Sequence, residues 1–321
     1  MHTILGAGGT ISGALTHELM KANHRIRLIS RRPVTTSAPN VDWQKADLLN
    51  YAELAKAAQG ATVLYLCPGL AYDSTVWQQQ WPTIVRNAID IAKANQARLI
   101  FLDNVYVYGL VDGPMTETTP YNPSSIKGDV QTQTAITLMD EVKAGNLRAS
   151  IARCPDFYGA GTQRSFYDAT VLDKFAKGQR AQWLGNVDKR HSYLYVPDAG
   201  KAMYLLGQHP DSDNQVWHMP TAPALTGREF IKLAADVYSV AGKYWSFNKL
   251  TVQLMGLFIP FMKNVVEVFY QYDQDYVFDS SKFERAFDFR PTSYRNGIVE
   301  LATSLYKPQV TSVSTSSLVA G

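Results

Sequence analysis

Three glycines near the N-terminus have the spacing of a dinucleotide-binding turn. The stretch ILGAGGTISGAL (residues 4–15) follows a predicted strand and opens a predicted helix. Gly6 permits a tight turn, while Gly8 and Gly9 let the backbone come close to a pyrophosphate. The helix that begins near Thr10 offers unpaired N–H groups and the positive end of its dipole. We therefore expect a dinucleotide cofactor at this turn.

The end of the second predicted strand, LISRRP (28–33), indicates which dinucleotide is bound. An acidic residue at this place would bond a free ribose 2′-hydroxyl, whereas arginine suits a 2′-phosphate. Ser30, Arg31 and Arg32 stand there, and no Asp or Glu does. This favours NADP(H), with NAD(H) also possible. Asp47 could accept the adenine amino group, or it could cap the next helix.

Polar residues end another predicted strand, in RLIFLDNVYVYG (98–109). Asp103 could act as a general base if burial raises its pKa. Asn104 can form hydrogen bonds but cannot transfer a proton at neutral pH, so it would orient a substrate carbonyl. Tyr106 and Tyr108 could either take part in catalysis or pack the strand end.

The elements that position these residues alternate between short apolar runs and amphipathic helices. This alternation predicts an α/β fold with a doubly wound parallel sheet, whose ligands bind at the carboxyl ends of the strands. After about residue 155 the pattern becomes helical and rich in aromatic residues. We expect an NAD(P)-binding Rossmann domain (1–155 and 186–220), a smaller, mostly helical substrate-binding domain (156–185 and 221–306) and a flexible tail (307–321).

Composition narrows the choice of partners. Lys and Arg number 31 against 28 Asp and Glu, without a dense basic run, so a nucleic-acid partner is not indicated and small molecules are. Cys67 and Cys154 lie in apolar runs and are interpreted as buried thiols, with no metal site. The immediate N-terminal strand leaves no room for a signal peptide, which predicts a cytoplasmic location.

The most apolar stretch is LTVQLMGLFIPFM (250–262). It falls short of the roughly 20 residues that span a bilayer. We interpret it as a core or lid helix, in preference to a membrane-surface helix, and expect no membrane partner. Phe166, Tyr167, Trp183 and the aromatic residues of VEVFYQYDQDY (266–276) suggest an apolar substrate pocket, although most of them must belong to the core.

Eight segments, in this order and spacing, together resemble one known family. They are the glycine turn, Asp47-Leu48, LYLCPG (64–69), Asn87, VYVYG (105–109), ETTPYNP (117–123), RCPDFYGAG (153–161) and HSYLYVPDAGKAM (191–203). The chain resembles, over about residues 3–305, the extended and atypical short-chain dehydrogenase/reductases of the NAD-dependent epimerase/dehydratase family. Similar proteins bind NAD(P) in a Rossmann domain and act on sugar nucleotides, ketones, aldehydes or related small molecules.

The resemblance implies a set of ligand contacts. Substrate would contact Asn104, Tyr158 and His191. His191 stands where many relatives carry an arginine that contacts a substrate phosphate. The absence of that arginine weakens the case for a nucleotide-sugar substrate. The implied cofactor contacts are Gly6, Gly8, Gly9, Thr10, Ile11, Ser30, Arg31, Arg32, Asp47, Leu48, Cys67, Pro68, Gly69, Asn87, Lys127, Pro155 and Phe157.

The sequence departs from the family at the catalytic residues. The family uses a Ser or Thr before the turn and a Tyr-x-x-x-Lys pair after it, but this chain has Asn104 at the first place and SSIKGDVQ (124–131) at the second. Lys127 and Gln131 thus replace the pair, and none of the 18 tyrosines has a lysine four residues later. A desolvated Lys127 could donate a proton; alternatively it is a surface lysine that begins a helix.

Three functions are consistent with these residues. The first is an NADP-dependent oxidoreductase that moves a hydride between nicotinamide and a small, fairly apolar carbonyl, alcohol or enone. The second is an NAD(P)-dependent epimerase or dehydratase. The third is a non-catalytic NAD(P)-binding sensor. Since similar proteins often dimerise through a four-helix contact, we expect a homodimer or a monomer.

Overall fold

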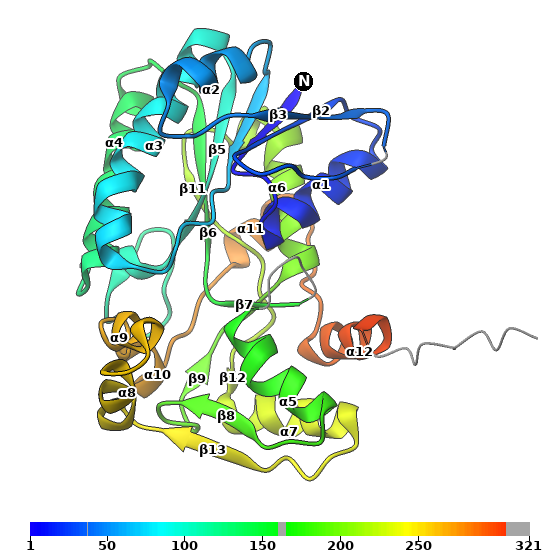
Figure 1. Ribbon diagram of the computed structural model, residues 1–321, viewed down its shortest axis with the longest axis vertical. Coiled ribbons are helices and arrows are strands. Elements are labelled where there is room, and N and C mark those ends of the chain that lie inside the picture. Colours follow the sequence, from blue (N-terminus) through cyan, green and yellow to red (C-terminus); the bar gives the residue numbers. More distant parts are fainter. Residues whose placement is uncertain (37, 160–164, 306–321) are drawn as a thin grey trace, which may run out of the picture.

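A seven-stranded parallel sheet forms the centre of the molecule. The computed structural model describes residues 1–36, 38–159 and 165–305. The strand order is β11-β6-β5-β4-β1-β2-β3, and every pairing is parallel (Figure 1). The bounds are β1 His2–Leu5, β2 Ile26–Ser30, β3 Val41–Lys45, β4 Val63–Leu66, β5 Arg98–Asn104, β6 Ala149–Cys154 and β11 Val216–His218. The predicted α/β fold with a doubly wound parallel sheet is confirmed.

Helices cover both faces of this sheet, which is why its central strands are continuous apolar runs. One face carries α1 (Thr10–Lys21) and α6 (Val196–Gln208), and a Cβ on Gly200 would lie 2.6 Å from the backbone of Ala14, so these two helices pack closely. The other face carries α2 (Tyr51–Ala57), α3 (Ser74–Asn95) and α4 (Ile126–Lys143).

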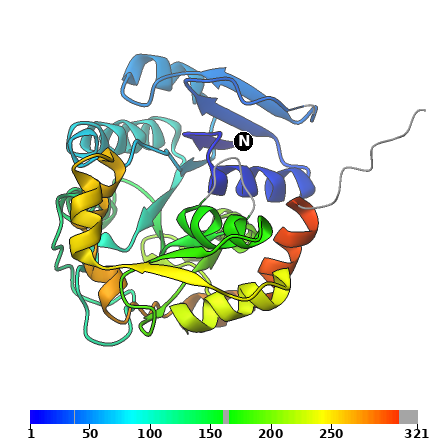
Figure 2. The same ribbon diagram turned by 60° about the horizontal axis from the view of Figure 1, so that its bottom comes forward.

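The C-terminal half adds a second layer below the carboxyl ends of the strands (Figures 1 and 2). It holds three two-stranded sheets, β7–β10, β9–β12 and β8–β13. Their bounds are β7 Phe157–Tyr158, β8 Ala181–Leu184, β9 Arg190–His191, β10 Leu194–Tyr195, β12 Leu225–Thr226 and β13 Tyr244–Phe247. Tyr158, Tyr193 and Phe230 lie in its buried core.

The helices of this half are short. They are α5 Asp173–Ala176, α7 Gly227–Tyr238, α8 Lys249–Gly256, α9 Pro260–Val266, α10 Tyr270–Asp273, α11 Ser281–Phe287 and α12 Tyr294–Leu305, with the turns η2 Asp168–Leu172 and η3 Pro210–Ser212. The turn η1, Tyr106–Tyr108, lies in the first half of the chain and follows β5. Phe283 of α11 packs into the core beneath the large sheet. The domain bounds drawn from the sequence stay a prediction, and the tail 307–321 lies outside the described residues.

The apolar stretch 250–262 forms α8 and the start of α9, with a break before Pro260. Val252 and Val265 are buried, as expected for core or lid helices, but Leu257 and Phe258 are exposed. Within the described residues, no helix combines the length and apolar character needed to cross a bilayer.

Candidate active site

A groove of about 450 Å³ lies along the glycine turn, at the carboxyl ends of β1, β2 and β4. Gly6 has φ +86°, and a Cβ there would lie 2.5 Å from the Cα of Pro68. Gly8 has φ +97°. These positions need glycine because the turn closes directly on the strand end. The groove is lined by Gly6, Ala7, Gly8, Gly9, Ser30, Arg31, Arg32, Pro33, Val34, Ala46, Asp47, Leu48, Leu49, Pro68, Gly69, Leu70, Gln80 and Ile84.

The basic end of the groove presents two exposed guanidinium groups. The Ser30 hydroxyl donates to the carbonyl oxygen of Arg32 (2.6 Å) and accepts from the Trp43 indole (2.9 Å), so it is used to fix the turn. Arg31 and Arg32 are exposed, and neither forms an ion pair with a described residue. Their charges are therefore available to an anionic ligand.

Some predicted cofactor residues support the groove from behind. Asn87 is buried and donates to the carbonyl oxygen of Leu48 (2.8 Å), so it fixes a residue of the wall. Cys67 is a buried free thiol, and Thr10 and Ile11 are buried in the first turns of α1. None of these four lines the groove.

Asp47 lies at the groove and accepts from the backbone N–H of Leu49 (3.0 Å). It is not the cap of the following helix, because Asn50 caps α2 by accepting from Glu53 N–H. The helix-cap alternative for Asp47 is therefore wrong, and its second carboxylate oxygen remains for a ligand.

Two tyrosine hydroxyl groups meet beyond the ends of β4 and β5. The Tyr72 and Tyr106 hydroxyls are 3.0 Å apart, and both rings are partly exposed. Asn104 accepts the backbone N–H of Tyr106 at its amide oxygen (3.0 Å), which starts the turn η1 and leaves the Asn104 amide nitrogen as a donor. Burial raises the pKa of both phenols, so each hydroxyl keeps its proton at neutral pH.

Lys127 is fully buried and lies against this pair. Its ammonium nitrogen is 4.4 Å from the centre of the Tyr72 ring. It donates to the Ser74 hydroxyl (3.0 Å), the Asn264 carbonyl oxygen (3.2 Å) and the Glu267 carboxylate. Burial lowers the pKa of Lys127, and the carboxylate of Glu267 opposes that shift. Lys127 therefore joins α4 to α9 beside the tyrosine pair. The alternative that it is a surface lysine at the start of a helix is wrong.

Gln131 is also buried, one turn along α4 from Lys127. Its amide oxygen accepts the hydroxyl of Thr134 (3.1 Å). The amide is thus engaged within its own helix.

Asp103 lies beneath the site in a buried ion pair. Both Nε (3.1 Å) and Nη2 (2.9 Å) of Arg153 donate to one oxygen of Asp103, and both side chains are fully buried. Arg153 also donates to the hydroxyls of Tyr108 and Tyr121. Burial raises the pKa of Asp103, and the Arg153 charge opposes it. This carboxylate does not line the groove, and its other oxygen, Oδ1, is buried without a hydrogen bond among the described residues.

Aromatic rings form a wall around His191, a residue predicted from the sequence to contact substrate. The His191 imidazole stacks on Tyr193, Tyr272 and Tyr276, with ring centres 4.7, 6.1 and 4.9 Å away. His191 Nε2 lies 3.2 Å from a carboxylate oxygen of Asp156, and neither atom has a hydrogen bond within the described residues. These two atoms are therefore candidates for contact with a ligand or water.

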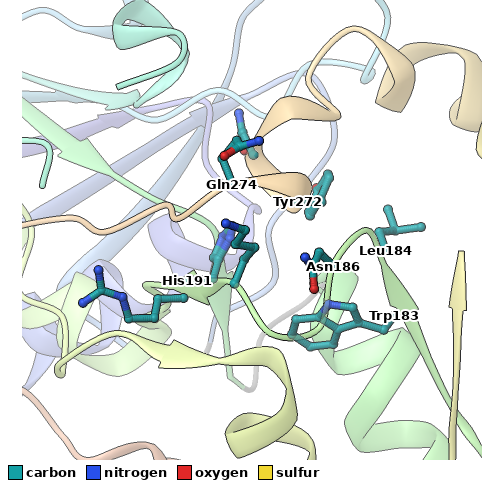
Figure 3. A pocket seen from close by; sticks show the side chains of 9 residues that line it. Trp183, Leu184, Asn186, His191, Tyr272 and Gln274 are labelled. Atoms are coloured by element: carbon teal, nitrogen blue, oxygen red, sulfur yellow. The ribbon is translucent and has the colours of Figure 1, made fainter. Parts of the chain in front are cut away.

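A narrow cavity of about 10 Å³ opens beside His191, where Asn186 and Tyr272 converge on the same space (Figure 3). This is room for about one water molecule. A larger cavity of about 460 Å³ shares Lys189, Arg190 and Gln274 with it. Arg190 is paired there with Asp275 (2.8 Å).

The remaining predicted residues are divided between this wall and the core. Phe157 follows Pro155 at the end of β6, is partly exposed, and pairs with Leu194 in the small sheet β7–β10. Tyr158 is fully buried, and a Cβ on Gly297 would lie 2.5 Å from its hydroxyl oxygen. Tyr158 thus lies in the core of the C-terminal half and not at the substrate wall.

Sequence reasoning missed several residues of the site. Tyr72 and Glu267 were assigned no role, and nothing local marks them because each meets its partners from a distant segment. The contact of Asp156 with His191 was not predicted either. The aromatic run 266–276 was a usable signal, since Tyr272 and Tyr276 from that run line the wall. Among the residues with described placement, no group of His, Cys, Asp or Glu could hold a metal ion.

Comparisons with known proteins agree with the fold. A family model described as "NAD dependent epimerase/dehydratase family" matches residues 2–219. The chain is similar in structure to a dTDP-glucose 4,6-dehydratase from Streptomyces venezuelae (15% identity, 94% of this chain and 96% of that one, TM-score 0.76). Similar values hold for the UDP-glucuronic acid 4-epimerase of Bacillus cereus (16%, 96% and 100%, 0.75) and the UDP-glucose 4-epimerase of Thermus thermophilus (15%, 94% and 98%, 0.76).

Among curated proteins, no sequence matches the chain significantly. The solved structures are too distant in sequence to show more than the fold. The family model, however, covers more than half of the chain. The resemblance inferred from the motifs is therefore confirmed: the chain belongs to the NAD-dependent epimerase/dehydratase family of extended short-chain dehydrogenase/reductases, a family of enzymes.

Proposed function

We propose that this chain is an NADP(H)-dependent oxidoreductase for a small carbonyl or alcohol substrate, with Tyr106 as the proton donor. The observation that carries the proposal is the Tyr72–Tyr106 hydroxyl pair (3.0 Å), which lies beyond the carboxyl ends of β4 and β5, and the end of β4 also borders the groove. Parallel sheets bind their ligands at this edge. The pair would therefore lie beside the reacting atoms.

The groove suits a dinucleotide phosphate. A Cβ at Gly6 would lie against Pro68, so glycine lets the turn close tightly there, and the positive end of the α1 dipole would face a pyrophosphate. Arg31 and Arg32 would hold a ribose 2′-phosphate, which supports NADP(H). NAD(H) is the alternative, because the Bacillus cereus and Thermus thermophilus structures were solved in complex with NAD.

The reaction needs a hydride at carbon and a proton at oxygen. NADPH held in the groove would supply the hydride for the carbonyl carbon. Asn104 would orient the carbonyl through its free amide nitrogen, and Tyr106 would give its proton to the oxygen. Tyr72 would return a proton to Tyr106 across the 3.0 Å contact, and the partly exposed Tyr72 would recover its own proton from water. The Lys127 ammonium beside Tyr72 would stabilise the negative charge that passes through the pair.

The substrate wall favours a neutral and fairly apolar molecule. Stacked rings surround His191, and the adjoining cavity has two basic residues, Lys189 and Arg190, against two acidic ones, Asp112 and Asp275. Since Arg190 is already paired with Asp275, little net positive charge remains for a substrate phosphate.

Asp103 and Lys127 have different parts in this proposal from those the sequence suggested. The closed ion pair with Arg153 gives Asp103 a structural role. Lys127 acts on charge beside Tyr72 and does not donate the proton itself, because its own N–H groups are taken by Ser74, Asn264 and Glu267.

The family membership favours a second candidate, an epimerase or dehydratase that keeps its cofactor. Net oxidation of NADPH distinguishes the oxidoreductase from the epimerase or dehydratase. Purified chain should oxidise NADPH with at least one member of a panel of aldehydes, ketones and enones. Conversion of nucleotide sugars without net NADPH oxidation would favour the epimerase or dehydratase instead. If NADPH is bound but neither reaction occurs, the oxidoreductase proposal is wrong and a sensor is favoured.

A further inference from the structure

The helical hairpin α8–α9 (residues 249–266) carries an unusual concentration of exposed apolar side chains. The exposed fraction is 85% for Phe258, 74% for Leu257 and 64% for Leu250. Seven of the thirteen exposed large apolar residues within the described part of the chain fall in 245–261: Trp245, Leu250, Leu254, Leu257, Phe258, Ile259 and Phe261. A concentration of exposed apolar side chains of this kind marks an interaction site.

The hairpin is firmly attached to the rest of the molecule. Val252 and Val265 pack with Leu184 and Phe269 in a separate small core. At its base, Lys127 donates to the Asn264 carbonyl oxygen (3.2 Å) and the Glu267 carboxylate. The inner face of the hairpin is thus already occupied, and the described residues offer its apolar outer face no partner to pack against.

The position of the hairpin leaves that face accessible. In both views α8 and α9 lie at the outer edge of the molecule, on the side opposite to α12 (Figures 1 and 2). The most exposed residues, Leu257 and Phe258, form the connection between the two helices. They are therefore the first residues that an approaching surface would meet.

The charged residues within the segment that forms this face all have one sign. Residues 243–263 contain Lys243, Lys249 and Lys263, all exposed, and no Asp or Glu. The Arg180 guanidinium adds a positive charge 4.6 Å from the centre of the Trp245 ring. Asp273, beyond the hairpin, is the acidic group that interacts with Lys249. Apolar and aromatic side chains among lysines are typical of segments that lie in the surface of an anionic bilayer.

A second copy of the chain fits this face less well. In a two-fold dimer the same patch would meet itself, so that the lysines of one copy would face those of the other. An anionic lipid surface would instead accept both the lysines and the apolar tip. Charge complementarity thus favours lipid.

We propose that the α8–α9 hairpin docks this chain on an anionic lipid bilayer, with Leu257 and Phe258 inserted at the boundary between headgroups and acyl chains. The segment would lie on the bilayer and not cross it. This inference does not rest on the proposed reaction. It nevertheless places the site near lipid, because the Phe261 ring centre is 5.6 Å from that of Tyr72.

The test is co-sedimentation of the full chain with vesicles of phosphatidylcholine, with and without phosphatidylglycerol. We expect binding to the vesicles that contain phosphatidylglycerol, weakened by salt. Phe258→Ser should reduce the partition coefficient about tenfold, since one large apolar side chain would no longer leave water. Lys249→Glu should reduce it about fivefold or more. The matched control is Ile136→Ser, at an exposed apolar residue of α4 (41%), which should bind like the wild type.

Thermal unfolding of each variant shows whether it is folded, as expected for exposed positions. Absence of wild-type binding to both kinds of vesicle would overturn the proposal. So would an equal loss in Ile136→Ser. A dimer in solution that Phe258→Ser dissociates, without vesicle binding, would assign the hairpin to a second copy and likewise contradict docking on lipid.

Discussion

At the scale of single residues, the site contains a phenol pair backed by a lysine in place of the family's Tyr-x-x-x-Lys arrangement. The tyrosines come from two loops, at 72 and 106, and the lysine from the start of α4. Lys127 still lies beside a tyrosine ring. This chain thus keeps a positive charge next to a phenol, although it lacks the Tyr-x-x-x-Lys spacing by which the family places one there.

Lys127 should also be important for stability. Lys127→Met would leave the Glu267 carboxylate without its partner in a mostly buried place, so we expect the free energy of unfolding to fall by about 3 kcal/mol. Lys143→Met, at an exposed lysine of the same helix, should change it by less than about 0.5 kcal/mol. Chemical denaturation measures both. Similar values for the two variants would show that the buried contact contributes little.

Cofactor choice is set by two arginines in the proposal. Exchanging Arg31 and Arg32 together for alanine should weaken NADPH binding about tenfold to a hundredfold, because charged hydrogen bonds to the 2′-phosphate are lost. The affinity for NADH should be almost unchanged. Fluorescence titration with both nucleotides gives the two constants. An equal loss for NADH and NADPH would argue against a 2′-phosphate site.

At the scale of elements, the glycine turn before α1 borders the groove and would hold the phosphates of the proposed cofactor. The turn could be predicted from the sequence because its tight backbone geometry requires glycine at fixed positions. The contact between Lys127 and Glu267 was not, because it joins residues 140 positions apart and leaves no local pattern. The two-residue strands β9 and β12 are likewise too short to show a period.

The turn can be tested with a matched pair of substitutions. Gly6→Ala forces a side chain to positive φ and against Pro68, so it should lower the free energy of unfolding by about 2 kcal/mol or more and abolish NADPH binding. Gly13 lies in α1, and a Cβ there would meet only open space. Gly13→Ala should therefore raise the free energy of unfolding by up to about 1 kcal/mol and leave NADPH binding intact. Retained binding in Gly6→Ala would contradict the assignment of the turn.

At the scale of the whole molecule, the large sheet was predictable and the covering half was not. Strands buried on both faces are continuous apolar runs, which alternate clearly with amphipathic helices. The C-terminal half instead combines small sheets with short helices such as α8 and α9. Its outer apolar face could not be separated from core by composition alone, since both consist of the same residue types.

Buried groups that join the two halves should make stability depend on pH. Burial, assisted by the Arg153 charge, lowers the pKa of His218 to about 3, and its ring bonds Tyr108 and the Asp279 carbonyl. The unfolded chain therefore binds one more proton between pH 6.5 and 3, and stability falls as the pH falls. Between pH 7 and pH 5, the titration of His218 should lower the free energy of unfolding by about 2 kcal/mol.

Denaturation of the wild type and His218→Gln at both pH values measures that contribution. The variant should lose about 2 kcal/mol less than the wild type over the same interval. Equal losses would show that His218 does not titrate with unfolding.

The most direct test of the proposed chemistry is NADPH oxidation by Tyr106→Phe, with a substrate that the wild type reduces. We predict a fall in kcat of at least about a hundredfold, because a positioned general acid is lost, with NADPH affinity unchanged. Tyr51→Phe, at an exposed tyrosine of α2, should react like the wild type. Turnover by Tyr106→Phe at the wild-type rate would contradict the account.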